Sequence, residues 1–95
     1  MDADSIPLQL GVLGSGAGTN LQAILDAIAS GSLPVRVTCV LSDVPDAFIL
    51  ERARRAEIPA IAIDCAPFRT KLDGAAEQRV LQILREHGAN AVALA

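Results

Sequence analysis

The stretch that is most informative about the fold of this chain is Gly14-Ser15-Gly16-Ala17-Gly18-Thr19-Asn20. It follows an apolar run, Leu8 to Leu13, and precedes an amphipathic run, Leu21 to Ile28, as at the passage from a strand to a helix. Small residues let the backbone approach a ligand. The free N–H groups and the dipole of a helix's first turn favour an anion. The stretch therefore predicts a site for a phosphorylated small molecule.

Strands and helices are expected to alternate along the whole chain. The expected strands are 9–13, 35–41, 58–63 and 90–95, and the expected helices are 20–29, 47–56 and 74–87. Pro45 and Asp46 are suited to start the second helix. Gly31 and Gly88 are expected to cap the first and third helices, whereas Glu57 stands where a glycine would cap the second, so we expect a looser ending there.

This alternation predicts an α/β fold, a Rossmann-like three-layer αβα arrangement with a right-handed parallel sheet of order 3-2-1-4. In that order the glycine-rich stretch lies at the switch point where ligands bind. We expect one domain from 8 to 95, preceded by a flexible tail at 1–7. The last expected strand is apolar and ends the sequence without a cap. We therefore expect the domain to be truncated after it and its exposed edge to be open to self-association.

Composition excludes several classes of function. The net charge of −3 comes without a basic cluster, so a nucleic-acid partner is not expected. The opening Met1-Asp2-Ala3-Asp4 is acidic and no apolar run is long enough to span a bilayer, so we expect a cytoplasmic protein with no membrane partner. Cys39 and Cys65 lack the spacing of metal ligands, which predicts reduced thiols and no metal site.

Several phosphate-binding motifs fit the stretch to different degrees. In the dinucleotide fingerprint GxGxxG, Gly14 and Gly16 match the first two positions but Thr19 stands at the third, while Asp43 is available as the ribose-binding acid. A Walker loop fails because no GK[ST] follows the glycines. A purely structural turn is the other alternative, yet four of the seven glycines lie within 11–18, more than a simple turn requires.

The stretch and its surroundings resemble the phosphoribosylglycinamide formyltransferase family, above all in Gly16-Ala17-Gly18-Thr19-Asn20-Leu21-Gln22-Ala23-Ile24. Further similar stretches are Val40-Leu41-Ser42-Asp43, Leu50-Glu51-Arg52-Ala53-Arg54, Ile58-Pro59-Ala60, Pro67-Phe68-Arg69 and Ala91-Val92-Ala93-Leu94-Ala95. The resemblance implies a folate-dependent transferase of purine synthesis. In that reaction the amine of phosphoribosylglycinamide attacks the formyl group of 10-formyltetrahydrofolate, so these two molecules are the expected partners.

The resemblance also assigns roles to individual residues. Gly18, Thr19 and Asn20 would bind the phosphate of phosphoribosylglycinamide, and Lys71 falls where the family usually carries a basic residue near the formyl-folate. The family's catalytic asparagine, histidine and aspartate come after the position of Ala95, so no catalytic residue and no turnover are expected of this chain alone. Two alternatives stay open: an NAD(P)-binding domain of an oxidoreductase, and a non-catalytic phosphate-binding or assembly module.

The remaining polar side chains have simpler interpretations. His87, the only histidine, falls in the last turn of a helix, where it is expected to pack partly and to interact with the negative end of the helix dipole. Arg52, Arg54 and Arg55 are interpreted as the solvated face of the second helix.

Overall fold

The computed structural model of the chain describes residues 8–63 and 74–95. In chain order the elements are β1 (Leu8–Leu13), α1 (Thr19–Ala29), β2 (Val35–Ser42), α2 (Phe48–Arg55), β3 (Ala60–Ala62), α3 (Gly74–Glu86) and β4 (Ala91–Leu94). The expected alternation is confirmed, and each boundary falls within two residues of the expected one. The tail expected at 1–7 lies outside the described residues.

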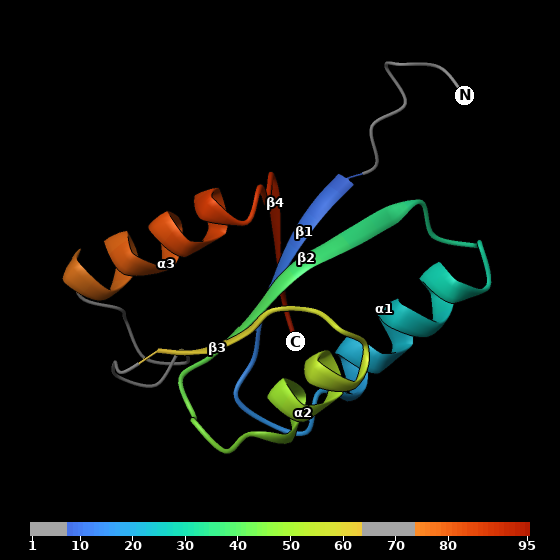
Figure 1. The fold of residues 1–95 in the computed structure, drawn as a ribbon, viewed down its shortest axis with the longest axis horizontal. Coiled ribbons are helices and arrows are strands. Elements are labelled where there is room, and N and C mark those ends of the chain that lie inside the picture. The colour runs from blue at the N-terminus through green and yellow to red at the C-terminus, as the bar shows by residue number, and fades with distance from the viewer. Residues whose placement is uncertain (1–7, 64–73) are drawn as a thin grey trace.

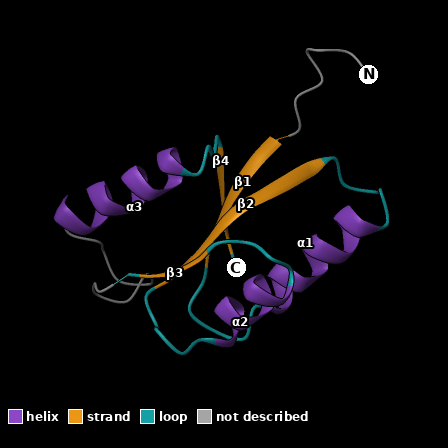
Figure 2. Cartoon of the chain, viewed as in Figure 1, coloured by secondary structure: helices purple, strands orange, loops and turns teal. Residues whose placement is uncertain are grey.

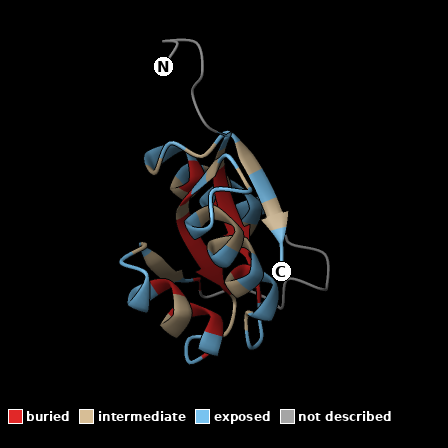
Figure 3. Ribbon diagram, turned by 90° about the vertical axis from the view of Figure 1, so that its right-hand side faces the viewer, coloured by how far each residue is buried: buried red, intermediate tan, exposed pale blue. Residues whose placement is uncertain are grey.

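The sheet is parallel throughout, with the order β3-β2-β1-β4 that the alternation predicts. Helices α1 and α2 cover one face and α3 covers the other, which makes the three expected layers (Figures 1 and 2). Two apolar clusters form the core, one on each face. The first includes Leu21, Ile49 and Leu50, and the second includes Val80 and Leu84. Figure 3 shows that the buried residues concentrate along the middle of the sheet.

A β-bulge in β2 decides which of its side chains face each layer. The pairing of β1 with β2 shifts by one residue, so that Thr38 is the extra residue. Val37 and Val40, three residues apart, therefore both join the cluster under α1 and α2, whereas Cys39 and Leu41 join the cluster under α3. The bulge lets one strand contribute apolar side chains to both halves of the core.

All three helices of the described residues end on a residue with left-handed backbone. The φ angles are 79° at Gly31, 61° at Glu57 and 72° at Gly88. After α2, the N–H of Ile58 donates to the Ala53 carbonyl at 2.9 Å, one of the two bonds of a Schellman ending. The glycine caps are thus confirmed. The looser ending expected at Glu57 is wrong, because this residue adopts the glycine conformation despite its Cβ.

Helix α2 begins differently from the expectation. Its N-cap is Ala47, which makes no side-chain cap bond, so Asp46 does not cap the helix. The preceding turn is fixed from β2 instead, since the Ser42 hydroxyl accepts the N–H of Val44 at 3.0 Å. Ser42 is fully buried, and this bond satisfies its hydroxyl there.

Strand β4 lies at one edge of the described sheet. Ala91 and Ala93 pack against the cluster under α1 and α2. On the other face Val92 and Leu94 are 50% and 80% exposed. Within the described residues, α3 therefore leaves Val92 and Leu94 exposed on that face.

Candidate functional site

The glycine-rich loop, residues 14–18, joins the carboxyl end of β1 to α1. Its first residue is tied to the sheet, because the N–H of Gly14 donates to the Leu41 carbonyl of β2 at 3.0 Å. The two neighbours of β1 are reached through helices on opposite faces, β2 through α1 and β4 through α3. The loop therefore lies at the topological switch point, as the sequence predicted.

Two of the loop glycines lie close against Ile49 of α2. Gly18 has a φ of 78°, and a Cβ there would lie 2.8 Å from the α-carbon of Ile49. A Cβ on Gly14 would lie 2.5 Å from the Ile49 Cδ1. Gly16 differs, because its Cβ would meet no described atom within 4 Å. The glycine cluster thus has a structural reason in part, namely the close approach of α2, while Gly16 borders open space.

The first turn of α1 is open to an anion. Its first intrahelical hydrogen bond runs from the N–H of Gln22 to the Gly18 carbonyl at 2.9 Å. The N–H groups of Thr19, Asn20 and Leu21 therefore precede the hydrogen-bonded part of the helix. Within residues 8–63 and 74–95 none of these three N–H groups has a backbone acceptor. The N-cap Gly18 offers no side chain, and the first turn carries no acidic residue. No acidic side chain of the first turn therefore offsets the positive end of the helix dipole.

The predicted phosphate residues are brought together at this point. Gly18 is the N-cap, and Thr19 and Asn20 open the helix with exposed side chains. Lys71, predicted near the formyl-folate, lies outside the described residues, as does Cys65.

Three contacts hold the loop against the segment from β2 to α2. The Ser15 hydroxyl bonds to the Asp43 carboxylate. The N–H of Ile49 donates to the Gly16 carbonyl at 3.0 Å, and the Arg52 Nε donates to the Ala17 carbonyl at 2.6 Å. Asp43 thus supports the loop in this structure, whereas the dinucleotide alternative gave it the ribose.

Arg52 is the residue that sequence reasoning misplaced. Its guanidinium also donates to the Gln22 side chain on α1 at 3.3 Å and lies 4.9 Å from the centre of the Phe48 ring. Arg54 and Arg55 are exposed as expected, but Arg52 is half-buried between α1, α2 and the loop. A sign of this is its spacing, because Arg52 lies one helical turn after the buried Ile49.

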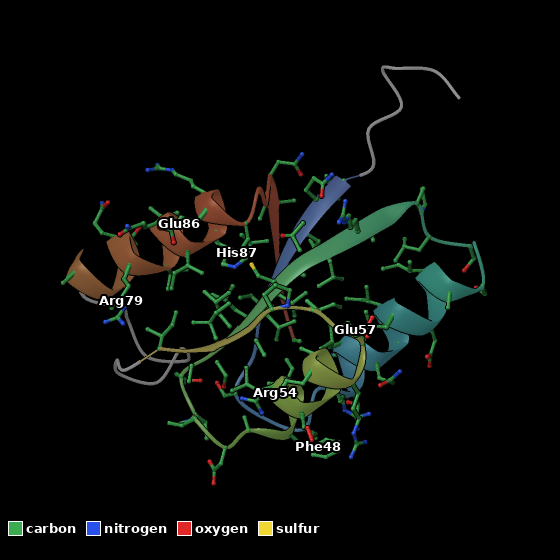
Figure 4. The ribbon with its side chains drawn as sticks, in the orientation of Figure 1. Phe48, Arg54, Glu57, Arg79, Glu86 and His87 are labelled. Atoms are coloured by element: carbon green, nitrogen blue, oxygen red, sulfur yellow. The ribbon has the colours of Figure 1, made fainter. Side chains whose placement is uncertain are left out.

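His87 is separate from the loop. It follows α3, on the face of the sheet opposite Phe48 and α2 (Figure 4). Its Nδ1 lies 2.8 Å from the Ile83 carbonyl of the last turn. The ring borders a groove of about 580 Å³ that also includes Gln9 and Arg36, near the amino ends of β1 and β2. The interpretation of His87 as a helix-end residue is confirmed by this placement.

Cys39 is buried in the cluster under α3. Burial raises the pKa of its thiol, and the Thr38 hydroxyl opposes this only in part. The thiol is therefore protonated and enclosed, as a structural cysteine is.

No three His, Cys, Asp or Glu side chains of residues 8–63 and 74–95 gather as a metal site would need. No helix in the same ranges is long and apolar enough to cross a membrane.

Comparison with known proteins gives a consistent picture. The profile of the family described as "Formyl transferase" matches residues 8–95. The phosphoribosylglycinamide formyltransferase of Haemophilus influenzae is 51% identical over 51 residues, 54% of this chain and 24% of that protein. Among solved structures, glycinamide ribonucleotide transformylase 1 from Symbiobacterium toebii aligns with a TM-score of 0.82 and 44% identity, over 94% of this chain and 41% of that one.

A relative with a different printed activity has the same fold. A formyltetrahydrofolate deformylase from Pseudomonas putida aligns with a TM-score of 0.81 and 28% identity, over 98% of this chain and 32% of that one. In each of these three alignments the chain spans less than half of the relative's length.

Proposed function

The chain belongs to the formyl transferase family, and from that premise we propose that it is the substrate-phosphate-binding part of a phosphoribosylglycinamide formyltransferase. The relative of this name from Haemophilus influenzae matches it at 51% identity over 51 residues. The observation that carries the proposal is the open first turn of α1 at the switch point of the sheet.

The phosphate of phosphoribosylglycinamide would sit in front of Gly18, Thr19 and Asn20. Three N–H groups precede the first bond of the helix there, and a phosphate dianion accepts from several donors at once. The Thr19 hydroxyl and the Asn20 amide, both exposed, add side-chain donors. Because no acidic residue lies in the first turn, no side chain of that turn repels the ligand.

The reaction proposed for the whole enzyme transfers one carbon. The glycinamide amine attacks the formyl group of 10-formyltetrahydrofolate, and the products are formylglycinamide ribonucleotide and tetrahydrofolate. Such a transfer needs a group that takes the amine's proton and donors that stabilise the oxyanion. We assign these roles to residues outside this chain and propose that the chain alone binds substrate without turnover. Lys71 is proposed to contact the formyl-folate.

A calorimetric titration with two ligands tests the phosphate assignment. Phosphoribosylglycinamide is expected to bind, and the same molecule without its phosphate is expected to bind at least tenfold more weakly, since charge-assisted hydrogen bonds would be lost. Equal affinity for the two ligands, or no heat with either, would refute the proposal. Tetrahydrofolate formation with both substrates would refute the assignment of the chemistry to other residues.

A second candidate function is assembly through β4, and the position of this strand at an edge of the described sheet favours it. The proposed partner is a second copy of the chain, paired edge to edge. Light scattering should then give a discrete dimer that Leu94→Lys converts to monomer. A monomer at every concentration would exclude this function, and heterogeneous aggregates would count against it.

A further inference from the structure

We infer that Arg52 is a positioning residue for the phosphate-binding loop: it turns the peptide between Ala17 and Gly18 so that its N–H faces the ligand. This inference rests on the proposed function, because the loop is positioned for the phosphate that this function assigns to it.

Two consecutive carbonyl groups of the loop are held by α2. The Gly16 carbonyl accepts the N–H of Ile49 at 3.0 Å, and the Ala17 carbonyl accepts the Nε of Arg52 at 2.6 Å. Both oxygens therefore point toward α2. In a trans peptide the C=O of one residue and the N–H of the next point in opposite directions, and the described chain has no cis peptide bond. The N–H groups of Ala17 and Gly18 must then point away from α2.

These loop N–H groups are followed directly by those of the first turn of α1. Gly18 is directly followed by the first turn of α1, whose N–H groups at Thr19 and Asn20 are also free of backbone acceptors in the described chain. Successive N–H groups in a loop with left-handed backbone form a concavity that binds anions. The φ of 78° at Gly18 supplies that backbone. Arg52 thus adds loop donors to those of the helix.

Arginine suits position 52 because its guanidinium has several donors. One guanidinium reaches the Ala17 carbonyl through Nε and the Gln22 side chain of α1 through a second nitrogen, at 3.3 Å. Its stem lies along α2, and its cation lies over the Phe48 ring at 4.9 Å. A planar fork with several donors can bridge loop and helix, whereas a lysine presents a single ammonium group.

The chain provides a matched control in Arg55. Its guanidinium also lies over the Phe48 ring, at 5.1 Å, and it carries the same charge on the same helix. Within the described residues no hydrogen bond from Arg55 to the loop is present. Arg52→Met removes the donors and the charge but keeps the alkyl stem, and Arg55→Met does the same beside it. Arg52→Lys keeps the positive charge but lacks the planar guanidinium with its several donors.

The experiment combines two readouts on these variants, at a temperature where all are folded. NMR order parameters of the Gly16, Ala17 and Gly18 amides, measured without ligand, report loop positioning. Titration with phosphoribosylglycinamide reports its consequence. Arg52→Met is expected to lower the order parameters and to weaken binding about tenfold. The Gly18 N–H would no longer be held toward the phosphate, and tenfold corresponds to the loss of one hydrogen bond to a charged group. Arg52→Lys should restore binding in part, and Arg55→Met should change it less than about twofold.

The outcomes separate this inference from the proposed function. Unchanged order parameters in Arg52→Met, or equal losses of affinity in Arg52→Met and Arg55→Met, would overturn the positioning role. If the wild-type chain fails to bind phosphoribosylglycinamide but Arg52→Met alone loosens the loop, the proposed function fails while the control of the loop by Arg52 stands.

Discussion

The backbone of Gly18 lies directly against Ile49. A Cβ added to Gly18 would lie 2.8 Å from the Ile49 α-carbon, 2.8 Å from its Cγ1 and 2.9 Å from its Cβ. This contact joins the start of α1 to the start of α2 and fixes the glycine-rich loop between them. It also makes the loop's shape part of the fold, so the two can be tested together.

Gly18→Ala is predicted to destabilise the chain by about 3 kcal/mol, the sum of left-handed strain and overpacking against backbone. Urea unfolding measures this loss. Gly16→Ala is the matched control, since its Cβ would meet no atom of the described residues within 4 Å, and it should cost less than about 1 kcal/mol. Equal losses in the two variants would contradict the account of the contact.

Glu57→Gly is predicted to stabilise the chain by about 0.5–1 kcal/mol. The residue holds a φ of 61° at the end of α2, where Gly31 and Gly88 end the other two helices. Relief of the left-handed strain, about 1–2 kcal/mol, exceeds the added freedom of the unfolded glycine chain, about 0.5–1 kcal/mol. Glu57→Ala separates strain from charge, because it removes the carboxylate but keeps the Cβ. A gain in the alanine variant as large as in the glycine variant would point to charge instead.

Asn20→Ala is predicted to weaken phosphoribosylglycinamide binding about tenfold or more while leaving the free chain's stability nearly unchanged, since the side chain is exposed. Thermal unfolding with ligand measures both. At a hundredfold excess over Kd the ligand adds about 2.7 kcal/mol to the wild type, and much of this shift should disappear in the variant. Gln82→Ala, exposed on α3, should keep the full shift. Loss of the shift in both variants would mean that the effect is not local.

Cys39 is predicted to resist alkylation in the folded chain. Burial encloses the thiol and raises its pKa, so at pH 8 less thiolate is present than in the unfolded chain, and reactivity should rise only at higher pH. Iodoacetamide labelling followed by peptide mapping measures this at Cys39 itself. Labelling at the same rate with and without urea would show that the thiol is accessible in the folded state.

The architecture was largely predictable because it depends on repeated local patterns. Aliphatic runs such as Leu8–Leu13 and Val35–Leu41 mark buried parallel strands, and amphipathic runs between them mark the covering helices. The handedness rule then leaves few strand orders, and the observed order is among them. The position of the loop followed from that order alone.

What escaped prediction depends on contacts between distant segments. The bulge at Thr38 arises from the register between β1 and β2, and the pattern of apolar residues in the sequence does not indicate it. Arg52 resembles its exposed neighbours in sequence, and only the packing of α2 on the loop brings it to the Ala17 carbonyl. The ending of α2 at Glu57 was misjudged because the tertiary structure imposes a backbone conformation that local preference disfavours.

The central claim is that a substrate phosphate binds in front of Gly18, Thr19 and Asn20, and an amide NMR titration tests it most directly. The ¹⁵N-labelled chain is titrated with phosphoribosylglycinamide and followed residue by residue. The account predicts that the largest chemical-shift changes occur at the amides of these three residues and of Ala17. The amide resonances at the groove that includes Arg36 and His87 should not shift. Shifts concentrated at that groove, or no shift in the loop at saturating ligand, would contradict it.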